Sequence, residues 1–205
     1  MSKADDYRAQ LLALHEWDAY LLKESGLPGP RGNIELAQVV ANLGELSLFQ
    51  RYLAYTPQRA PVNSPYEFLA FCGALGLGRL LAEGDTRQLV QLHTLASDSR
   101  WRVREAVAMA LQQFGDKDMD HLLLEMQAWS QGTPLEQRAA AAALCEPRLL
   151  GEARHARKVL QILDNITATF HAPSVHPRED VLILRKGLGY CWSVAVVALP
   201  EEGKA

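Results

Sequence analysis

Residues 98–118 constrain the fold most, because they describe one amphipathic helix with both of its ends marked. Asp98 has the side chain of a helix N-cap, and Gly115-Asp116 follows the end of the apolar pattern. The apolar residues between them recur at the spacing of a single helix face: Val103, Val107, Ala110 and Leu111. Ala106 and Ala108 add small side chains that let a neighbouring helix approach closely. A helix of this kind packs against others, as it does where helix pairs stack side by side.

A related pattern returns later in the chain. Val103-Arg104-Glu105-Ala106 aligns with Gln137-Arg138-Ala139-Ala140, so that Arg138 follows Arg104 by 34 residues. That shift is within the range of helical-repeat periods. The first copy pairs predicted helices at 86–97 and 99–114, and the second pairs 119–131 with a helix that opens at Thr133-Pro134.

Breaker residues and caps predict helices through the rest of the chain, at 3–25, 34–43, 45–55, 64–83, 152–171 and 177–199. No β-branched run alternates with polar residues, so we expect no sheet. The expected organisation is one all-α domain over 1–205. It has N-terminal helices in 1–63, the clearest repeats in 64–150, a long helix pair in 151–199 and a tail at 200–205.

The segment Val103-Arg104-Glu105-Ala106, with Asp98 before it and Gly115-Asp116 after it, resembles the HEAT-repeat family, and the second copy resembles it more loosely. The resemblance covers residues 85–150. It implies a right-handed α-solenoid of stacked antiparallel helix pairs, whose concave face is the usual binding surface. In that family the Asp and Arg of this pattern form contacts between successive repeats. The resemblance therefore implies structural roles for Asp98, Arg104 and Arg138.

HEAT-like repeats also build the bacterial alkylpurine DNA glycosylases, which this chain resembles more distantly. Their concave surface carries Arg and Lys for phosphates, with Trp and Asp around the damaged nucleotide. Trp101-Arg102 and the basic group at 148–158 are similar in composition. The paired Trp followed by Asp that those enzymes use for catalysis is absent, since this chain has no Trp-Trp. That absence counts against glycosylase activity.

Composition favours an intracellular protein without a strong preference for nucleic acid. The formal charge is −3, without the basic excess of a dedicated DNA binder. Three widely spaced cysteines within helical patterns predict reduced, buried thiols, and the N-terminus lacks a signal-peptide pattern, so we expect the cytoplasm. The most apolar run, 188–199, is shorter than the roughly 20 residues of a membrane span. We therefore expect a buried closing helix and no membrane association.

The first candidate binding group is Arg100, Trp101 and Arg102, with Arg104 close by. Arginine donors at a helix N-terminus can gather around phosphate while an aromatic face stacks on a base. The alternative is structural: Trp101 packs on the preceding helix and the two neighbouring arginines are solvated.

A second basic group is formed by Arg148, Arg154, Arg157 and Lys158, the last three of which share one side of a predicted helix. It is either a phosphate-binding group or a solvated helix face.

Trp17 and Asp18 lie beside Tyr20 on the first predicted helix and form a third candidate, a pocket lining. Adjacent helical residues point about 100° apart, so the two need not face one pocket together.

Metal and cofactor chemistry is not predicted. His121 and Glu125 are four residues apart, but no third ligand has suitable spacing, and a surface hydrogen bond is the simpler interpretation. His171 and His176 flank a loop that we interpret as exposed. The glycines of an apolar helix indicate close packing or a ligand at the backbone, rather than a phosphate loop: Gly73, Gly76 and Gly78, with Gly187 and Gly189 near the C-terminus.

The expected function is that of a binding or scaffold protein, which engages a protein or peptide through the concave face of the repeats. The alternative is a DNA-binding or alkylated-base repair protein. The sequence contains no recognisable local catalytic motif, so we expect a binding protein rather than an enzyme.

Overall fold

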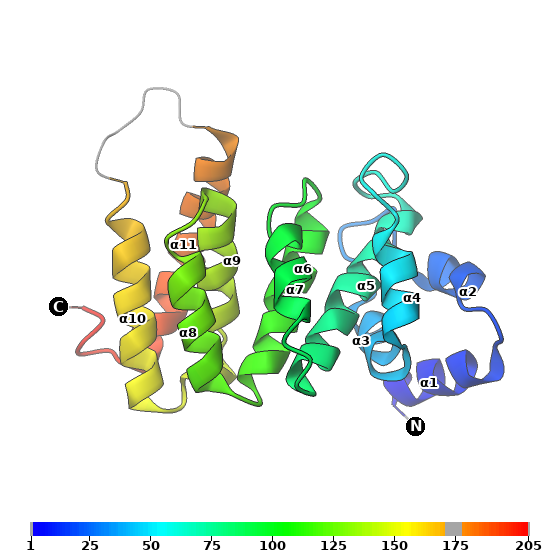
Figure 1. Ribbon diagram of the computed structural model, residues 1–205, viewed down its shortest axis with the longest axis horizontal. Helices are drawn as coiled ribbons and strands as arrows, with labels where there is room; N and C mark the ends of the chain where they lie inside the picture. The colour runs from blue at the N-terminus through cyan, green and yellow to red at the C-terminus, as the bar shows by residue number, and fades with distance from the viewer. Residues whose placement is uncertain (1, 171–177, 205) are drawn as a thin grey trace. The chain divides into compact units, whose positions relative to one another are not determined.

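The computed structural model describes residues 2–170 and 178–204, and within these ranges the chain is all-helical, with no strand (Figure 1). The expected all-α class is thereby confirmed. Residue contacts divide the chain into two compact units, 1–110 and 111–205. Helix α7 (Trp101–Gly115) begins in the first unit and ends in the second.

The N-terminal unit contains six complete helices and the start of α7. Their bounds are α1 Lys3–Ala13, α2 Asp18–Glu24, α3 Ile34–Leu43, α4 Leu46–Leu53, α5 Pro65–Ala82 and α6 Gln88–Leu95. Asn33 caps α3 by accepting a hydrogen bond from the backbone N–H of Leu36, and Pro65 occupies the first turn of α5.

The single helix expected over 3–25 is wrong, because the chain breaks after α1. Leu14 has extended backbone angles, and the indole Nε1 of Trp17 donates to the carbonyl of Leu11 at 2.9 Å. This side chain satisfies a carbonyl at the C-terminal end of α1, where carbonyls have no helical partner. A second, short helix then starts at Asp18.

Helix α5 is the centre of the N-terminal unit and contacts α2, α3, α4 and α6. Every residue from 67 to 78 is buried. A Cβ on Gly76 would lie 2.3 Å from the Phe49 ring, and one on Gly78 would lie 2.4 Å from the Cα of Ala110. Close packing therefore explains the glycines of α5, which let α4 and α7 approach it. It does not explain Gly189, where an added Cβ would meet no atom within 4 Å.

The C-terminal unit packs α9 (Pro134–Leu144) and α10 (Ala153–Thr167) against α11 (Glu179–Ala198), with α8 (Met119–Trp129) on α9 and α10. A short 3-10 helix, Pro147–Leu150, joins α9 to α10. Asp118 and Thr133 cap α8 and α9 through their side chains.

Helix α11 differs from the buried closing helix that we expected. Its buried side chains form one stripe: Leu184, Leu188, Cys191 and Ala195. Its bounds agree with the helix predicted at 177–199. The helix has 20 residues, and an 18-residue window of it has a mean hydropathy of 1.5, with 22% of the window buried; by length and composition alone it could cross a membrane. Arg185 and Lys186 lie within it, and charged side chains in hydrocarbon are costly.

Candidate functional site

A hollow of about 360 Å³ lies beside Trp101 in the N-terminal unit. We call it the Trp101 pocket. The 27–32 loop, the first residue of α3, helix α5 and the start of α7 supply its lining: Leu27, Pro30, Arg31, Gly32, Ile34, Phe68, Phe71, Trp101, Arg102 and Glu105. Phe68 and Phe71 are buried, and their rings stack with centroids 6.4 Å apart. The pocket therefore has an aromatic floor belonging to the core of the unit.

Two large apolar side chains at the pocket stay in solvent. Trp101 is 46% exposed and Ile34 is 48% exposed. The guanidinium carbon of Arg102 lies 4.4 Å from the Trp101 ring centroid, a cation–π distance that fixes one face of the indole. The indole is thus partly covered and partly exposed to solvent.

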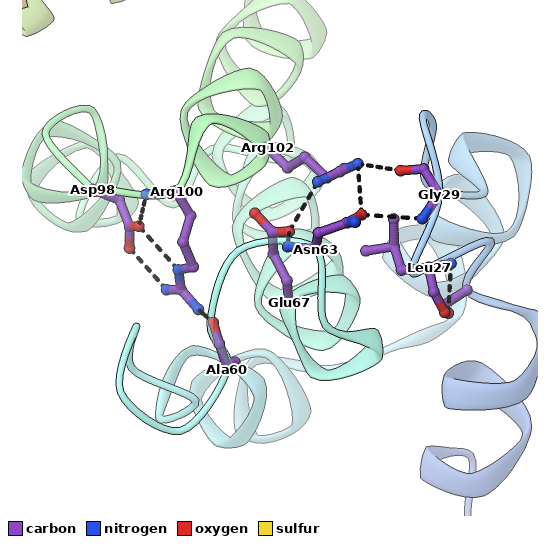
Figure 2. A network of polar contacts seen from close by, with 9 residues as sticks. Leu27, Gly29, Ala60, Asn63, Glu67, Asp98, Arg100 and Arg102 are labelled. Atoms are coloured by element: carbon purple, nitrogen blue, oxygen red, sulfur yellow. Dashed lines mark hydrogen bonds and ion pairs between the residues drawn. The ribbon is translucent and has the colours of Figure 1, made fainter.

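Arg102 is not a solvated arginine but the centre of a buried network (Figure 2). Its Nη1 donates to Oε2 of Glu67 at 3.1 Å, and its Nη2 donates to the carbonyl of Gly29 at 2.7 Å. Asn63 completes the network. Its side-chain Oδ1 accepts hydrogen bonds from the backbone N–H of Gly29 and from Arg102, and its backbone N–H donates to the Glu67 carboxylate. The guanidinium thus ties the 27–32 loop to α5 and α7.

The network includes one residue with an uncommon backbone conformation and two buried polar atoms without a hydrogen-bond partner. Asn63 has a φ of 67°, the left-handed region that Asn tolerates better than most residues. Nε of Arg102 and Oε1 of Glu67 are buried without a hydrogen-bond partner among the described residues. Breaking the remaining bonds of either group would be costly, since a buried charge needs its partner.

Arg100 is also internal, which contradicts its expected position in solvent. It is 2% exposed, and its Nε and Nη2 donate to the carboxylate of Asp98 at 2.9 and 2.8 Å. Its Nη1 donates to the carbonyls of Tyr55 and Ala60, at 2.7 and 3.4 Å. The Asp98–Arg100 pair therefore clamps the segment after α4 (Figure 2). The donors expected to gather around a phosphate are used inside the protein.

The three residues that the resemblance makes structural, Asp98, Arg104 and Arg138, have the following contacts within their own units. The carboxylate of Asp98 also accepts from the backbone N–H of Arg100 at 2.7 Å, near the start of α7. Arg104 donates to the carbonyls of Asp98 and Ser99. In the C-terminal unit, the side chain of Arg138 lies against Gly187 of α11, where a Cβ would be 3.4 Å from its Cγ.

The second basic group is neutralised by nearby carboxylates. Arg148 pairs with Asp116 at 2.8 Å and Glu146 at 3.0 Å, and Arg154 pairs with Glu152 at 2.7 Å and Asp120 at 3.1 Å. Lys158 lies 3.9 Å from Asp120, and Arg157 pairs with Glu202. Arg148 and Arg154 border a polar hollow of about 430 Å³ that has acidic side chains as well as basic ones. No uniformly positive face follows from these residues.

Trp17 and Asp18 face different surroundings. Trp17 lines a hollow of about 410 Å³ between α1 and the start of α4. The carboxylate of Asp18 accepts two hydrogen bonds from Arg51, at 2.9 and 3.0 Å, and one from the Tyr52 hydroxyl at 2.9 Å. Burial and the Asp18 carboxylate raise the pKa of Tyr52 well above its ordinary value. Asp18 is not part of the lining of this hollow, although its partner Arg51 is.

Among residues 2–170 and 178–204, no group of three His, Cys, Asp or Glu side chains is placed so that it could hold a metal ion. His121 and Glu125 lie 3.6 Å apart, and the His121 ring packs edge-on against Phe114. His171 and His176 lie outside the described residues.

Sequence reasoning missed Glu67, Asn63 and the pocket floor of Phe68 and Phe71. Glu67 is the one acid in the long apolar run at the start of α5, and it is fully buried. An acid within an apolar helix is the signal that should have predicted a buried cation as its partner.

Comparisons with protein families, curated proteins and solved structures find no match to this chain.

Proposed function

We propose that this protein is a HEAT-like helical-repeat binding protein, and that its N-terminal unit binds an apolar segment of a protein partner in the Trp101 pocket. The 34-residue recurrence of the Arg104 pattern at Arg138 and the all-helical structure support this repeat architecture. In the proposed arrangement, antiparallel helix pairs stack as a right-handed solenoid and partners bind its concave face.

The observation that carries the proposal is the half-exposed Trp101 at the edge of an aromatic-floored pocket. Covering the exposed part of this ring would remove roughly 100 Å² of apolar surface from water, worth about 2–3 kcal/mol. Tryptophan is enriched among the residues that dominate binding energy at protein interfaces. The Arg102 network holds the surrounding loop in place, so little ordering is needed when a partner binds.

The charges near the pocket favour a peptide over a nucleic acid. Arg100 and Arg102 use their donors on internal acceptors, and Arg31 and Glu105 bring opposite charges to the same lining. A partner with a large apolar side chain between polar neighbours fits such a lining. Nucleic-acid binding relies on several cations that remain available to phosphates.

The test is selection of peptides from a phage-displayed random library, with counter-selection on Trp101→Ala. Enriched peptides should share a large apolar residue. Their dissociation constants, measured by fluorescence polarisation, should rise about tenfold or more for Trp101→Ala. Val90→Ala is the matched control, because Val90 is 74% exposed in the same unit and lies outside the pocket lining. It should bind the peptides like the wild type.

Two outcomes would contradict the proposal. One is a set of selected peptides that bind Trp101→Ala as tightly as the wild type. The other is tight binding of duplex DNA that weakens steeply as salt rises and is lost in Trp101→Ala, with no peptide enriched. That second result would favour the DNA-binding alternative.

A further inference from the structure

The lining of the Trp101 pocket contains one cation whose donors are not used within the protein. Arg31 borders the pocket, and its side chain is exposed to solvent. Within the part of the chain that the structure describes, its guanidinium forms no ion pair and no hydrogen bond. The other arginine of the lining, Arg102, is neutralised by the buried carboxylate of Glu67. The donors of Arg31 are therefore available to a ligand at the pocket.

The backbone that carries Arg31 is held on both sides. Before it, the carbonyl of Gly29 accepts a hydrogen bond from Nη2 of Arg102 at 2.7 Å (Figure 2). After it, the backbone N–H of Asn33 donates to the carbonyl of Ser25 at 2.9 Å. The Cα of Arg31 is thus placed beside the pocket before a partner binds, and only its side chain remains to be ordered.

The size of the pocket suits one large apolar side chain better than a long segment. Its volume of about 360 Å³ is near the lower limit of ligand-binding sites, which is roughly 300 Å³. The aromatic floor and the exposed part of Trp101 provide apolar contacts for such an anchor. The residues next to the anchor in the partner's sequence would then lie at the edge of the pocket, within reach of Arg31.

A carboxylate is the group that complements Arg31 best. The planar guanidinium binds a carboxylate through two parallel hydrogen bonds, which fix the geometry of the pair as well as its charge. A partner that covers Trp101 also excludes water from the edge of the pocket, and the pair is stronger where water is excluded. The phosphates of a nucleic acid would need several available cations, and the acid Glu105 in the same lining opposes additional negative charge.

We propose that the segment bound in the Trp101 pocket has a carboxylate next to its apolar anchor, and that Arg31 selects for this carboxylate. The inference rests on the function proposed above and names the class of segment that the pocket recognises. The carboxylate belongs either to an acidic side chain beside the anchor or to the C-terminus of a partner that ends there.

The test exchanges charges between Arg31 and the peptide. Peptides enriched on the wild type should carry Asp or Glu within two residues of the apolar anchor. Each is synthesised with that acid or with Lys in its place, and dissociation constants are measured by fluorescence polarisation in about 50 mM NaCl. On the wild type, the change to Lys should raise the dissociation constant about fivefold or more. On Arg31→Glu, the peptide with Lys should bind more tightly than the acidic one.

Arg8→Glu is the matched control, because Arg8 is an exposed arginine of the same unit and lies outside the pocket lining. It should prefer the acidic peptide as the wild type does. Circular dichroism should show the same helical content in both variants. In about 500 mM NaCl the preference of the wild type should decrease, since a pair at the edge of a pocket is screened by salt.

A second set of peptides identifies the source of the carboxylate. These peptides lack the acid and end directly after the anchor, with either a free or an amidated C-terminus. Tighter binding of the free form would assign the carboxylate to the end of the partner chain. Equal and weak binding of both forms would assign it to an acidic side chain. Binding of the amidated form as tight as that of the acidic peptide would overturn the inference.

Other outcomes separate this inference from the function on which it rests. Peptides that depend on Trp101 but carry no acid would overturn the role of Arg31 and leave the peptide-binding function standing. The same peptide preference in the wild type and Arg31→Glu would do so too. A reversed preference in Arg8→Glu would attribute the effect to net charge. Peptides that bind Trp101→Ala as tightly as the wild type would contradict the proposed function itself, and the inference with it.

Discussion

The Arg102 guanidinium lies 3.1 Å from the Glu67 carboxylate, and the two side chains are 6% and 0% exposed. Removing one partner leaves an uncompensated charge in the protein interior. We therefore expect Glu67→Gln to lower the free energy of unfolding by about 3–5 kcal/mol, measured by urea denaturation.

A double variant separates the loss of charge pairing from the loss of packing at this position, and a surface variant is its control. Glu67→Leu/Arg102→Met removes both charges and should regain much of the lost stability. Glu202→Gln is the control, because its pair with Arg157 is exposed at the surface and should leave the urea midpoint unchanged. A Glu67→Gln protein that unfolds at the wild-type midpoint would show that the buried pair is not needed.

Gly78→Ala should destabilise the protein although alanine favours helices. The added Cβ would lie 2.4 Å from the Cα of Ala110 and 2.8 Å from its carbonyl oxygen, and backbone atoms cannot move aside as a flexible side chain can. We expect a loss of about 1–3 kcal/mol in thermal or urea unfolding. In Gly151→Ala, where φ is −66° and nothing lies within 4 Å of the new Cβ, stability should stay the same or rise. Equal effects at the two glycines would contradict the close packing of α5 and α7.

The carboxyl of Asp85 should titrate near pH 2. Arg87 donates to both of its oxygens, at 2.6 and 2.9 Å, and Gln88 adds a third hydrogen bond at 2.8 Å. These bonds, which favour the charged form, lower the pKa of Asp85 from 3.8 to about 2. Since the folded pKa is the lower one, the stabilising contribution is present above the unfolded pKa and is lost as the pH falls from about 4 towards 2.

Arg87→Ala tests the cause of this shift. It removes two of the three bonds, so the pKa of Asp85 should rise towards 3.8 in an NMR titration of the carboxyl carbon. Lys23→Ala, which removes a cation of the same unit that pairs with Glu24 and makes none of these bonds, should leave the titration where it is. An Asp85 pKa that does not respond to Arg87→Ala would assign the shift to another source.

The three thiols should react slowly with Ellman's reagent in the native protein and quickly in urea. Burial raises the pKa of Cys72, and a hydrogen bond with Cys191 together with burial raises that of Cys145. A high pKa and a covered sulfur both suppress the reactive thiolate. Leu124→Cys should add one thiol that reacts at once, because position 124 is exposed. Rapid labelling of the wild type without denaturant would contradict the buried positions.

The helices were largely predictable from sequence because their signals are local. Asn33, Asp118 and Thr133 cap helices within three residues of their own positions, and an apolar stripe is visible in any window of a few turns. The break after α1 has no such local signal. The Trp17 indole donates to the carbonyl of Leu11 at this break, and residue spacing does not predict that contact.

The surroundings of Arg100, Trp101 and Arg102 were decided by the tertiary structure. In sequence the two arginines flank a tryptophan and look equally suited to solvent or phosphate. In the folded chain Glu67 and Gly29, 35 and 73 residues before Arg102, provide its acceptors, and Tyr55 and Ala60 provide those of Arg100. Helical periodicity fixes which residues share a face, but the partner of a buried charge comes from distant chain segments. Only folding brings those segments together, and it leaves Trp101 as the exposed member of the three.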